Sequence, residues 1–210
     1  AARAAGVRRA CRASGATVVA EPGRRPGDFA ATALAVVAFG IAFGYLEAAV
    51  VVYLRAALEI APGAVPGHDP ATFGTFEAVE IAREAATLVM IGAVGFLAGR
   101  QLLERLAWAA VVFGSWDIVY YAGLWLTIGW PPGLDTWDVL FLIPLPWVGP
   151  VWAPVTVSAA LVAFGLLAAY RLRAGRAVVV RPANVLAALA GGALVIASFL
   201  VDTARVAAGD

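Results

Sequence analysis

The stretch that decides the fold runs from Leu106 to Gly129 and reads LAWAAVVFGSWDIVYYAGLWLTIG. At about 1.5 Å of rise per helical residue, it is long enough to cross a hydrocarbon core of about 30 Å. Asp117, near its middle, is the one charged residue in this stretch. A carboxylate at the bilayer centre costs roughly 2.5 to 3.5 kcal/mol on insertion scales, so it normally faces the protein interior and marks function.

The composition agrees with a membrane protein. The chain has 210 residues, of which 62% are hydrophobic and 14% charged, and its mean hydropathy of +0.87 lies far outside the range of soluble domains. Asking for about 20 apolar residues per span predicts an all-α polytopic transmembrane helical bundle. Its five predicted spans are Phe29–Leu54, Val79–Gly99, Leu106–Gly129, Val151–Tyr170 and Ala183–Val201. Residues 28–204 form this five-span domain, and residues 1–27 are predicted to be a disordered basic segment or a wrongly assigned start.

The arginines predict the orientation. Twelve of the fifteen lie in the N-terminal segment, in the turn around Arg100 and Arg105, or in the turn that holds Arg171 to Arg181. The remaining three, Arg55, Arg83 and Arg205, fall on the other side. By the positive-inside rule, the N-terminus is cytoplasmic and the C-terminus lies outside the inner membrane.

Charged residues inside three spans predict a common site. Glu47 lies in the first span, and Glu80, Arg83 and Glu84 lie at the mouth of the second. Asp117 precedes two tyrosines by about one helical turn, so their hydroxyls can bond its carboxylate. We expect these groups to converge on one cavity that opens to the outside. The predicted ligand- or proton-binding residues are Glu47, Glu80, Arg83, Glu84, Asp117, Tyr120 and Tyr121.

The carboxylates in this predicted cavity outnumber the cations, so protons or a bound cation must neutralise them. Oxygen ligands suit Mg²⁺, Ca²⁺ or Mn²⁺, and the candidate metal ligands are Glu47, Glu84 and Asp117. In the alternative interpretation, Arg83 and Arg55 form buried ion pairs that only fix the helix packing.

Other cofactors have little support in the sequence. Cys11 is the single cysteine and His68 the single histidine, which excludes a Cys/His zinc site. Haem ligands are equally scarce inside the spans. No nucleic-acid motif is present, and the basic N-terminal segment favours anionic lipid head groups of the bilayer instead.

The segment from Asp138 to Pro150 is apolar, too short to span and interrupted by prolines. Proline forbids a regular helix there, and irregular backbone at membrane depth needs burial or water. The segment is therefore either a re-entrant lid or an interfacial loop lying flat on the outer leaflet. As a lid it supplies a gate, whose predicted residues are Asp138, Pro144, Pro146, Trp147 and Pro150.

Two glycine pairs allow close helix approach. Gly40 and Gly44 lie one turn apart in the first span, and Gly95 and Gly99 do the same in the second. Such small-residue faces mediate packing between membrane helices. They predict close packing and, because the chain is small, a homodimer through one of these faces.

Three functions remain open. The leading prediction is binding or transport of a cation or a proton-coupled solute. The second is a membrane-embedded enzyme acting on a lipid or isoprenoid substrate, and the third is an accessory or structural subunit of a membrane complex. The absence of a Walker loop, a GxSxG elbow and an HExxH pair disfavours primary pumps and soluble-type hydrolases.

Four runs carry a resemblance to known proteins. They read FGYLEAAVVVYLR (43–55), REAATLVM (83–90), WDIVYY (116–121) and WDVLFLIPLPWVGPV (137–151). Over about residues 30–170 the chain resembles an uncharacterised family of small bacterial integral membrane proteins. The resemblance implies a fold class and nothing about mechanism.

Overall fold

The computed structural model describes residues 17–19, 26–57, 70–143 and 146–208. Its helices are α2 (Pro26–Ala57), α3 (Pro70–Ala98), α4 (Leu102–Ile128), α5 (Trp152–Arg173) and α6 (Pro182–Ala208). All 5 are long and apolar enough to cross a membrane. The prediction of a helical protein with five such segments is confirmed, and the helices extend a few residues beyond most of the predicted spans.

Helix α4 is the centre of the bundle, with α2, α3 and α5 packed around it. Its residues Trp108, Val111, Val112 and Leu124 are each 0% exposed. Trp108, Val111 and Val112 follow helical spacing on one face, Leu124 lies on another, and half of the α4 span is buried, which is typical of a helix with neighbours on several faces. The apolar run from Leu106 to Gly129, which predicted a membrane span, thus also supplies much of the core.

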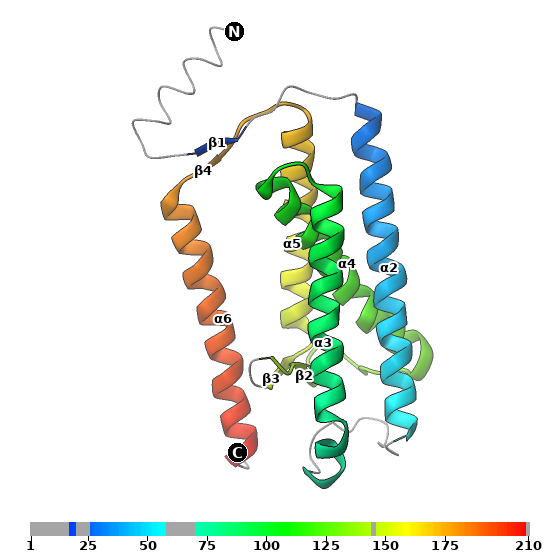
Figure 1. The fold of residues 1–210 in the computed structure, drawn as a ribbon. Helices are drawn as coiled ribbons and strands as arrows, with labels where there is room; N and C mark the ends of the chain where they lie inside the picture. The colour runs from blue at the N-terminus through cyan, green and yellow to red at the C-terminus, as the bar shows by residue number, and fades with distance from the viewer. Residues whose placement is uncertain (1–16, 20–25, 58–69, 144–145, 209–210) are drawn as a thin grey trace, which may run out of the picture.

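The two ends of the bundle differ in the segments that meet there (Figure 1). At one end, called here the Arg-rich end, α2 begins, α3 turns into α4, and α5 ends near the turn that holds Arg171 to Arg181. At the opposite end, called the hairpin end, two short strands lie beside the start of α5. Helix α6 ends on the hairpin side, opposite to the beginning of α2 (Figure 1).

Glycines let the helices approach α4 closely. A Cβ atom on Gly44 of α2 would lie 2.4 Å from the carbonyl oxygen of Trp116, and one on Gly95 of α3 would lie 2.7 Å from that of Arg105. Gly40 and Gly99 also face α4 within the same chain. The predicted close packing is therefore present, and α4 of the same chain lies against both glycine faces. A homodimer stays a prediction.

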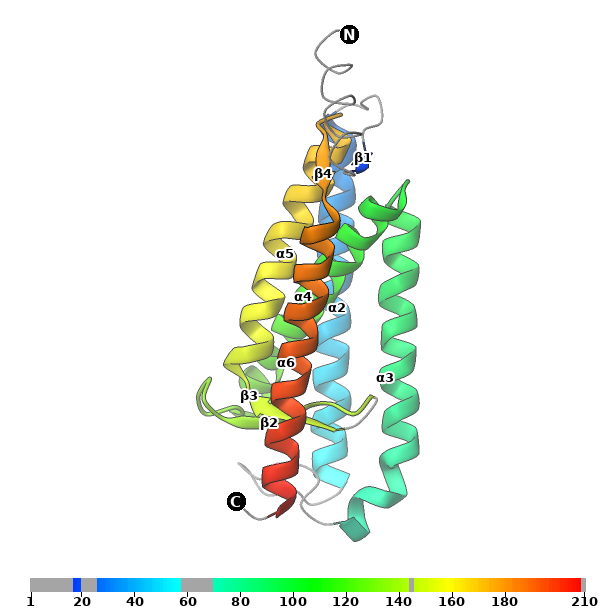
Figure 2. The same ribbon diagram turned by 90° about the vertical axis from the view of Figure 1, so that its left-hand side faces the viewer.

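Helix α6 stands apart from the other helices (Figures 1 and 2). None of the residues in its apolar segment, Pro182–Val201, is buried. It packs mainly on the second strand of the hairpin, where the Phe199 ring stacks on Trp147 with centroids 6.4 Å apart. The described structure is therefore a four-helix core with an attached fifth helix.

A second strand pair holds the other end of α6. Strand β1 (Thr17–Val19) runs antiparallel to β4 (Val178–Val180), with Thr17 opposite Val180. These three residues of the predicted disordered segment thus have a regular backbone partner in β4. The prediction for residues 1–27 as a whole stays a prediction. Helix α2 also begins earlier than predicted, at Pro26, and the rest of the segment lies outside the described residues.

The proline-rich segment forms an antiparallel hairpin. Strand β2 (Trp137–Phe141) pairs with β3 (Trp147–Pro150), and Trp137 lies opposite Pro150. Aromatic and β-branched residues favour strands, while Pro146 precedes β3 and Pro150 is its last residue. Pro144 lies outside the described residues. The hairpin packs across the helix ends, and its depth in a bilayer stays a prediction.

Candidate functional site

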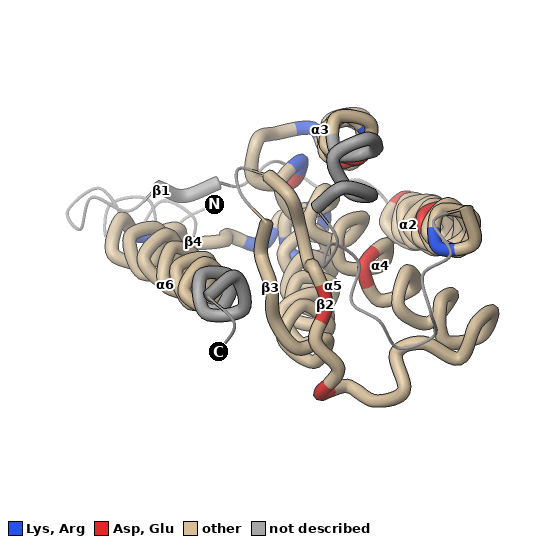
Figure 3. The backbone as a smooth tube through the Cα atoms, turned by 90° about the horizontal axis from the view of Figure 1, so that it is seen from below, with Lys and Arg blue, Asp and Glu red and all other residues tan. Residues whose placement is uncertain are grey.

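A polar cavity of about 50 Å³ lies near the hairpin end. Three helices and β2 enclose it, and the tube carries acidic positions on α2, α4 and β2 on this side of the bundle (Figure 3). We call it the carboxylate cavity. Its lining residues are Glu47, Arg83, Glu84, Thr87, Trp116, Asp117, Tyr120, Tyr121, Val139, Leu140 and Phe141. The structure thus brings together six of the seven predicted ligand- or proton-binding residues, and Glu80 lies just outside.

Glu47 enters the cavity from α2 and is 4% exposed. It comes three residues after Gly44, whose missing side chain lets α2 lie directly on α4. The Thr87 hydroxyl on α3 donates a hydrogen bond to Glu47 Oε1 at 3.0 Å, and the Arg83 guanidinium forms an ion pair with the same carboxylate. The close α2–α4 contact therefore delivers Glu47 to a site shared with α3.

Arg83 connects two carboxylates on different helices. Its Nε and Nη2 donate to Glu80 Oε2 at 3.1 and 2.9 Å, while Nη1 pairs with Glu47. The Glu80 pair has the three-residue spacing that places both side chains on one face of α3. A single guanidinium therefore serves two acids, one inside the cavity lining and one beside it.

Glu84 attaches the hairpin to α3. The backbone N–H of Leu142 donates to both carboxylate oxygens, at 3.1 and 2.9 Å, and Glu84 is 7% exposed. This contact directly follows β2, whose Val139, Leu140 and Phe141 line the cavity. Glu84 is thus both a cavity residue and an anchor of the cavity's cover.

Asp117 is bonded from α5. The Ser158 hydroxyl donates to Asp117 Oδ2 at 2.8 Å, and both residues are buried. The prediction that the two following tyrosines bond this carboxylate is wrong for Tyr121, whose hydroxyl donates to Asp138 instead. The reason is the tight α4–α5 contact at Gly114, where a Cβ atom would lie 2.4 Å from the Ser158 carbonyl oxygen. This contact places Ser158 directly against Asp117.

Aromatic rings form the remaining wall. Tyr120 stacks on Trp116 with centroids 6.4 Å apart and meets Tyr121 edge-on at 4.9 Å. Within the described residues, the buried Nε1 of Trp116 has no hydrogen-bond partner. A buried unpaired donor is the kind of group that an ordered water or a ligand satisfies.

Asp138 of β2 lies behind the cavity rather than in it. It is 4% exposed and accepts a hydrogen bond from the Tyr121 hydroxyl at 3.2 Å. Burial raises the pKa of Asp138 to about 7, although the Tyr121 hydrogen bond and the charge of Arg55 act in the opposite direction. Arg55 itself is buried and lies over the Trp130 ring at 4.3 Å.

The predicted gate residues occupy different positions. The residues of the hairpin that line the cavity are Val139, Leu140 and Phe141 of β2, which the sequence did not single out. Trp147 and Pro150 belong to β3, and Trp147 lies against Phe141 and Phe199. Pro146 precedes β3. The part of the predicted lid segment, Asp138 to Pro150, that lines the cavity is therefore β2, whereas β3 packs on α6. A gating role for any of these residues stays a prediction.

The described residues contain no group of three or more His, Cys, Asp or Glu side chains close enough to hold a metal ion. The candidate ligands Glu47, Glu84 and Asp117 line one cavity, but each is bonded to protein groups. A divalent cation in this cavity stays a prediction.

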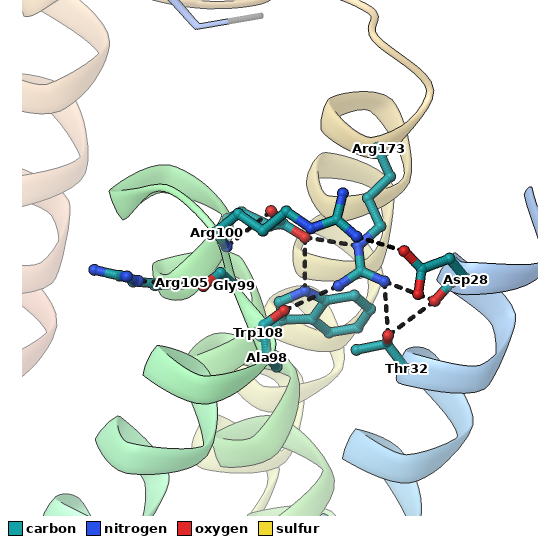
Figure 4. Close-up of polar contacts among 9 residues, drawn as sticks. Asp28, Thr32, Ala98, Gly99, Arg100, Arg105, Trp108 and Arg173 are labelled. Carbon is teal, nitrogen blue, oxygen red and sulfur yellow. Dashed lines mark hydrogen bonds and ion pairs between the residues drawn. The ribbon is translucent and has the colours of Figure 1, made fainter. Parts of the chain in front are cut away.

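Sequence reasoning missed a second polar cluster, at the Arg-rich end (Figure 4). Arg173 is 7% exposed, and its Nε donates to Glu104 Oε1 at 2.7 Å. Its other nitrogens donate to Asp28 O, Thr32 Oγ1 and Ala98 O. The cluster, called here the Arg173 cluster, joins α2, α3, α4 and α5. One signal in the sequence could have indicated an ion pair here, because Glu104 is an acid at an end of the bundle that is rich in arginine.

No protein-family model, curated protein or solved structure matches the chain. The resemblance to a bacterial membrane-protein family stays a prediction.

Proposed function

We propose that this multi-pass membrane protein binds a small cation or a proton in the carboxylate cavity and transports it, alone or coupled to a solute. The observation that carries the proposal is the charge balance of the cavity. Three carboxylates, from Glu47, Glu84 and Asp117, line it with one guanidinium, Arg83. That guanidinium is shared with Glu80 as well. Buried charges need partners, so protons or a bound cation complete the site.

The size of the cavity supports a small ligand. A water molecule in the liquid occupies about 30 Å³, so a cavity of about 50 Å³ accommodates one or two waters, or one small cation. The aromatic rings of Trp116 and Tyr120 add surfaces that attract cations. A larger solute requires the hairpin to move away from Glu84.

The proposed orientation follows from the arginines. The Arg-rich end faces the cytoplasm of a bacterial inner membrane, and the hairpin end faces outward. In that orientation the carboxylate cavity lies in the outer half of the bilayer and β2 covers it from outside. The hairpin then acts as the gate.

The test is the stability and flux of matched isosteric variants. Glu84→Gln and Asp117→Asn keep an acceptor for Leu142 and Ser158 but remove the charge, and Asp135→Asn changes an exposed acid outside the cavity as a control. The unfolding of detergent-purified protein is followed with Na⁺, K⁺, Mg²⁺, Ca²⁺ or Mn²⁺ added. A cation at a hundred times its dissociation constant adds about 2.7 kcal/mol to the free energy of unfolding.

Proteoliposomes then measure cation or proton flux for the same proteins. We expect wild type and Asp135→Asn to carry the ion and the cavity variants to lose the flux. Equal flux in all four proteins would contradict the proposal. Stabilisation by an ion without any flux would retain the binding site and remove transport.

One observation favours a second function, that of a subunit in a membrane complex. Helix α6 has no buried residue in its apolar segment, which leaves its sides free for lipid or for a partner helix. Gentle solubilisation followed by mass measurement distinguishes the two. A defined hetero-complex supports a subunit, and a lone monomer contradicts it.

A further inference from the structure

A second hollow lies at the opposite end of the bundle, between α2 and α3. It is a groove of about 590 Å³, formed because both helices pack on α4 and have little contact with each other. Its wall is apolar, and Asp28, Thr32, Arg100 and Arg173 lie at its polar end. The apolar wall is made by Ala31, Ala35, Val36, Phe39, Val94 and Leu97.

We propose that this groove binds one anionic phospholipid, with the phosphate on Arg100 and an acyl chain along the apolar wall. The dimensions fit. From Asp28 to Phe39 the groove follows α2 for about 16 Å, at 1.5 Å per residue. That is close to one leaflet of a hydrocarbon core of about 30 Å. The polar end therefore lies at head-group level when the apolar wall lies among acyl chains.

Arg100 is the available cation of the two arginines in the groove. Arg173 is 7% exposed and uses its nitrogens on Glu104, Asp28 O, Thr32 and Ala98 O (Figure 4). The Arg100 side chain is 32% exposed and forms an ion pair with Asp28, which is 40% exposed. An arginine can hold a phosphate through two parallel hydrogen bonds. Arg173 thus fixes the floor of the groove, and Arg100 recognises the ligand.

The charge around the groove selects an anion. In the described part of this end, two acids, Asp28 and Glu104, stand against six arginines, so the end carries a surplus of positive charge. These arginines are Arg100, Arg105, Arg171, Arg173, Arg176 and Arg181. Anionic lipids are attracted by about 1 kcal/mol per basic residue near the surface, which is about fivefold in affinity.

Asp28 gives the proposal a second, opposite test. Its carboxylate holds Arg100, so a lipid phosphate must displace it. Arg173 uses the backbone oxygen of Asp28 and not its side chain, so Asp28→Asn leaves that contact in place. We expect Asp28→Asn to strengthen lipid binding about fivefold and Arg100→Gln to weaken it about fivefold.

The experiment measures lipid retention by native mass spectrometry of the full chain in mild detergent. The probes are phosphatidylglycerol and phosphatidylcholine with identical acyl chains, and soluble glycerol phosphate. Ala35→Phe fills the groove, and Ala38→Phe places the same side chain at an exposed position of α2 outside the groove lining. Arg171→Gln removes an exposed arginine at the same end but outside the groove.

The expected result is one phosphatidylglycerol per chain, retained equally by wild type, Ala38→Phe and Arg171→Gln and lost from Ala35→Phe. Retention falls about fivefold in Arg100→Gln and rises about fivefold in Asp28→Asn. Three outcomes would overturn the proposal. Equal retention of phosphatidylcholine removes anion selectivity, and equal loss in Arg171→Gln shows attraction by the whole end. Glycerol phosphate binding as well as the lipid removes the role of the apolar wall.

Discussion

At the Arg-rich end, the buried guanidinium of Arg173 donates to the carboxylate of Glu104 and to three neutral oxygen acceptors, so charge and hydrogen bonds balance. At the hairpin end, the guanidinium of Arg83 is shared by Glu47 and Glu80, and Glu84 and Asp117 have only neutral hydrogen-bond donors. The first arrangement is complete without a ligand. Buried charge in one small bundle thus forms a fully paired cluster at one end and, at the other, leaves two acids with only neutral hydrogen-bond donors.

We expect the largest loss of stability from a substitution in the Arg173 cluster. Arg173→Met leaves the buried Glu104 carboxylate without its ion-pair partner, which costs about 3 to 5 kcal/mol of unfolding free energy. Chemical denaturation in detergent measures it, with Arg171→Met as the exposed control from the same helix end. A loss below about 1 kcal/mol would show that the Arg173 cluster does not hold the helices together. The double variant Arg173→Met, Glu104→Gln should recover part of the loss.

The next effect concerns how Glu47 reaches the cavity. Gly44→Ala places a Cβ atom 2.4 Å from the Trp116 carbonyl oxygen, so α2 must move away from α4. Overpacking of this kind costs about 1 to 3 kcal/mol, and it should also weaken any cation response of the cavity. Gly92→Ala is the matched control, because no atom lies within 4 Å of its added Cβ. Equal stability of the two variants would contradict the role of close α2–α4 packing.

A pH series sharpens the comparison at the hairpin. Burial raises the pKa of Asp138 to about 7 from an ordinary 3.8. The folded state therefore binds the proton more tightly than the unfolded state, and stability is highest below pH 4 and falls as the pH rises towards 7. Between pH 5 and 7 this amounts to about 2 kcal/mol.

Asp138→Asn should remove this part of the pH dependence in denaturation curves, while Asp135→Asn should leave it unchanged. An unaltered pH profile in Asp138→Asn would show that Asp138 keeps an ordinary pKa.

The smallest expected effect lies at Asp117. Ser158→Ala removes a buried hydrogen bond worth about 1 kcal/mol, and it leaves the cavity's charge unchanged. Ser198→Ala, at an exposed position of α6, should change stability by less than about 0.5 kcal/mol. Equal values for both serines would mean that the α5 contact does not support Asp117.

The sequence predicted the helices well because hydrophobic length is a strong and local signal. The span around Asp117, predicted from Leu106 to Gly129, became α4 from Leu102 to Ile128. The acidic residues that line the cavity could also be predicted, since acids inside apolar runs are rare. The hydrogen-bond partners of these acids could not be predicted from the sequence. The rotation of each helix about its own axis determines that Asp117 contacts Ser158 and that Tyr121 contacts Asp138. A single sequence does not specify these rotations.

Two elements were missed for separate reasons. Strand β2 was not predicted because the prolines of this apolar segment only excluded a helix. Its aromatic and β-branched residues, which favour a strand, pair with β3. Arg173 was counted as one of many arginines that set orientation. Its burial depends on Glu104, which lies 69 residues away in the chain, so only tertiary structure joins them.

Helix α6 joins the hairpin to an apolar segment that has little packing of its own. Its apolar part, Pro182–Val201, has 20 residues and is about 30 Å long, which equals the average hydrocarbon thickness. It is held near its two ends by β4 and β3, so little side-chain packing resists a change in its tilt. A thinner membrane tilts such a helix. Because Phe199 stacks on Trp147, we expect such a tilt to reach β3 and, through it, the strand β2 that covers the carboxylate cavity.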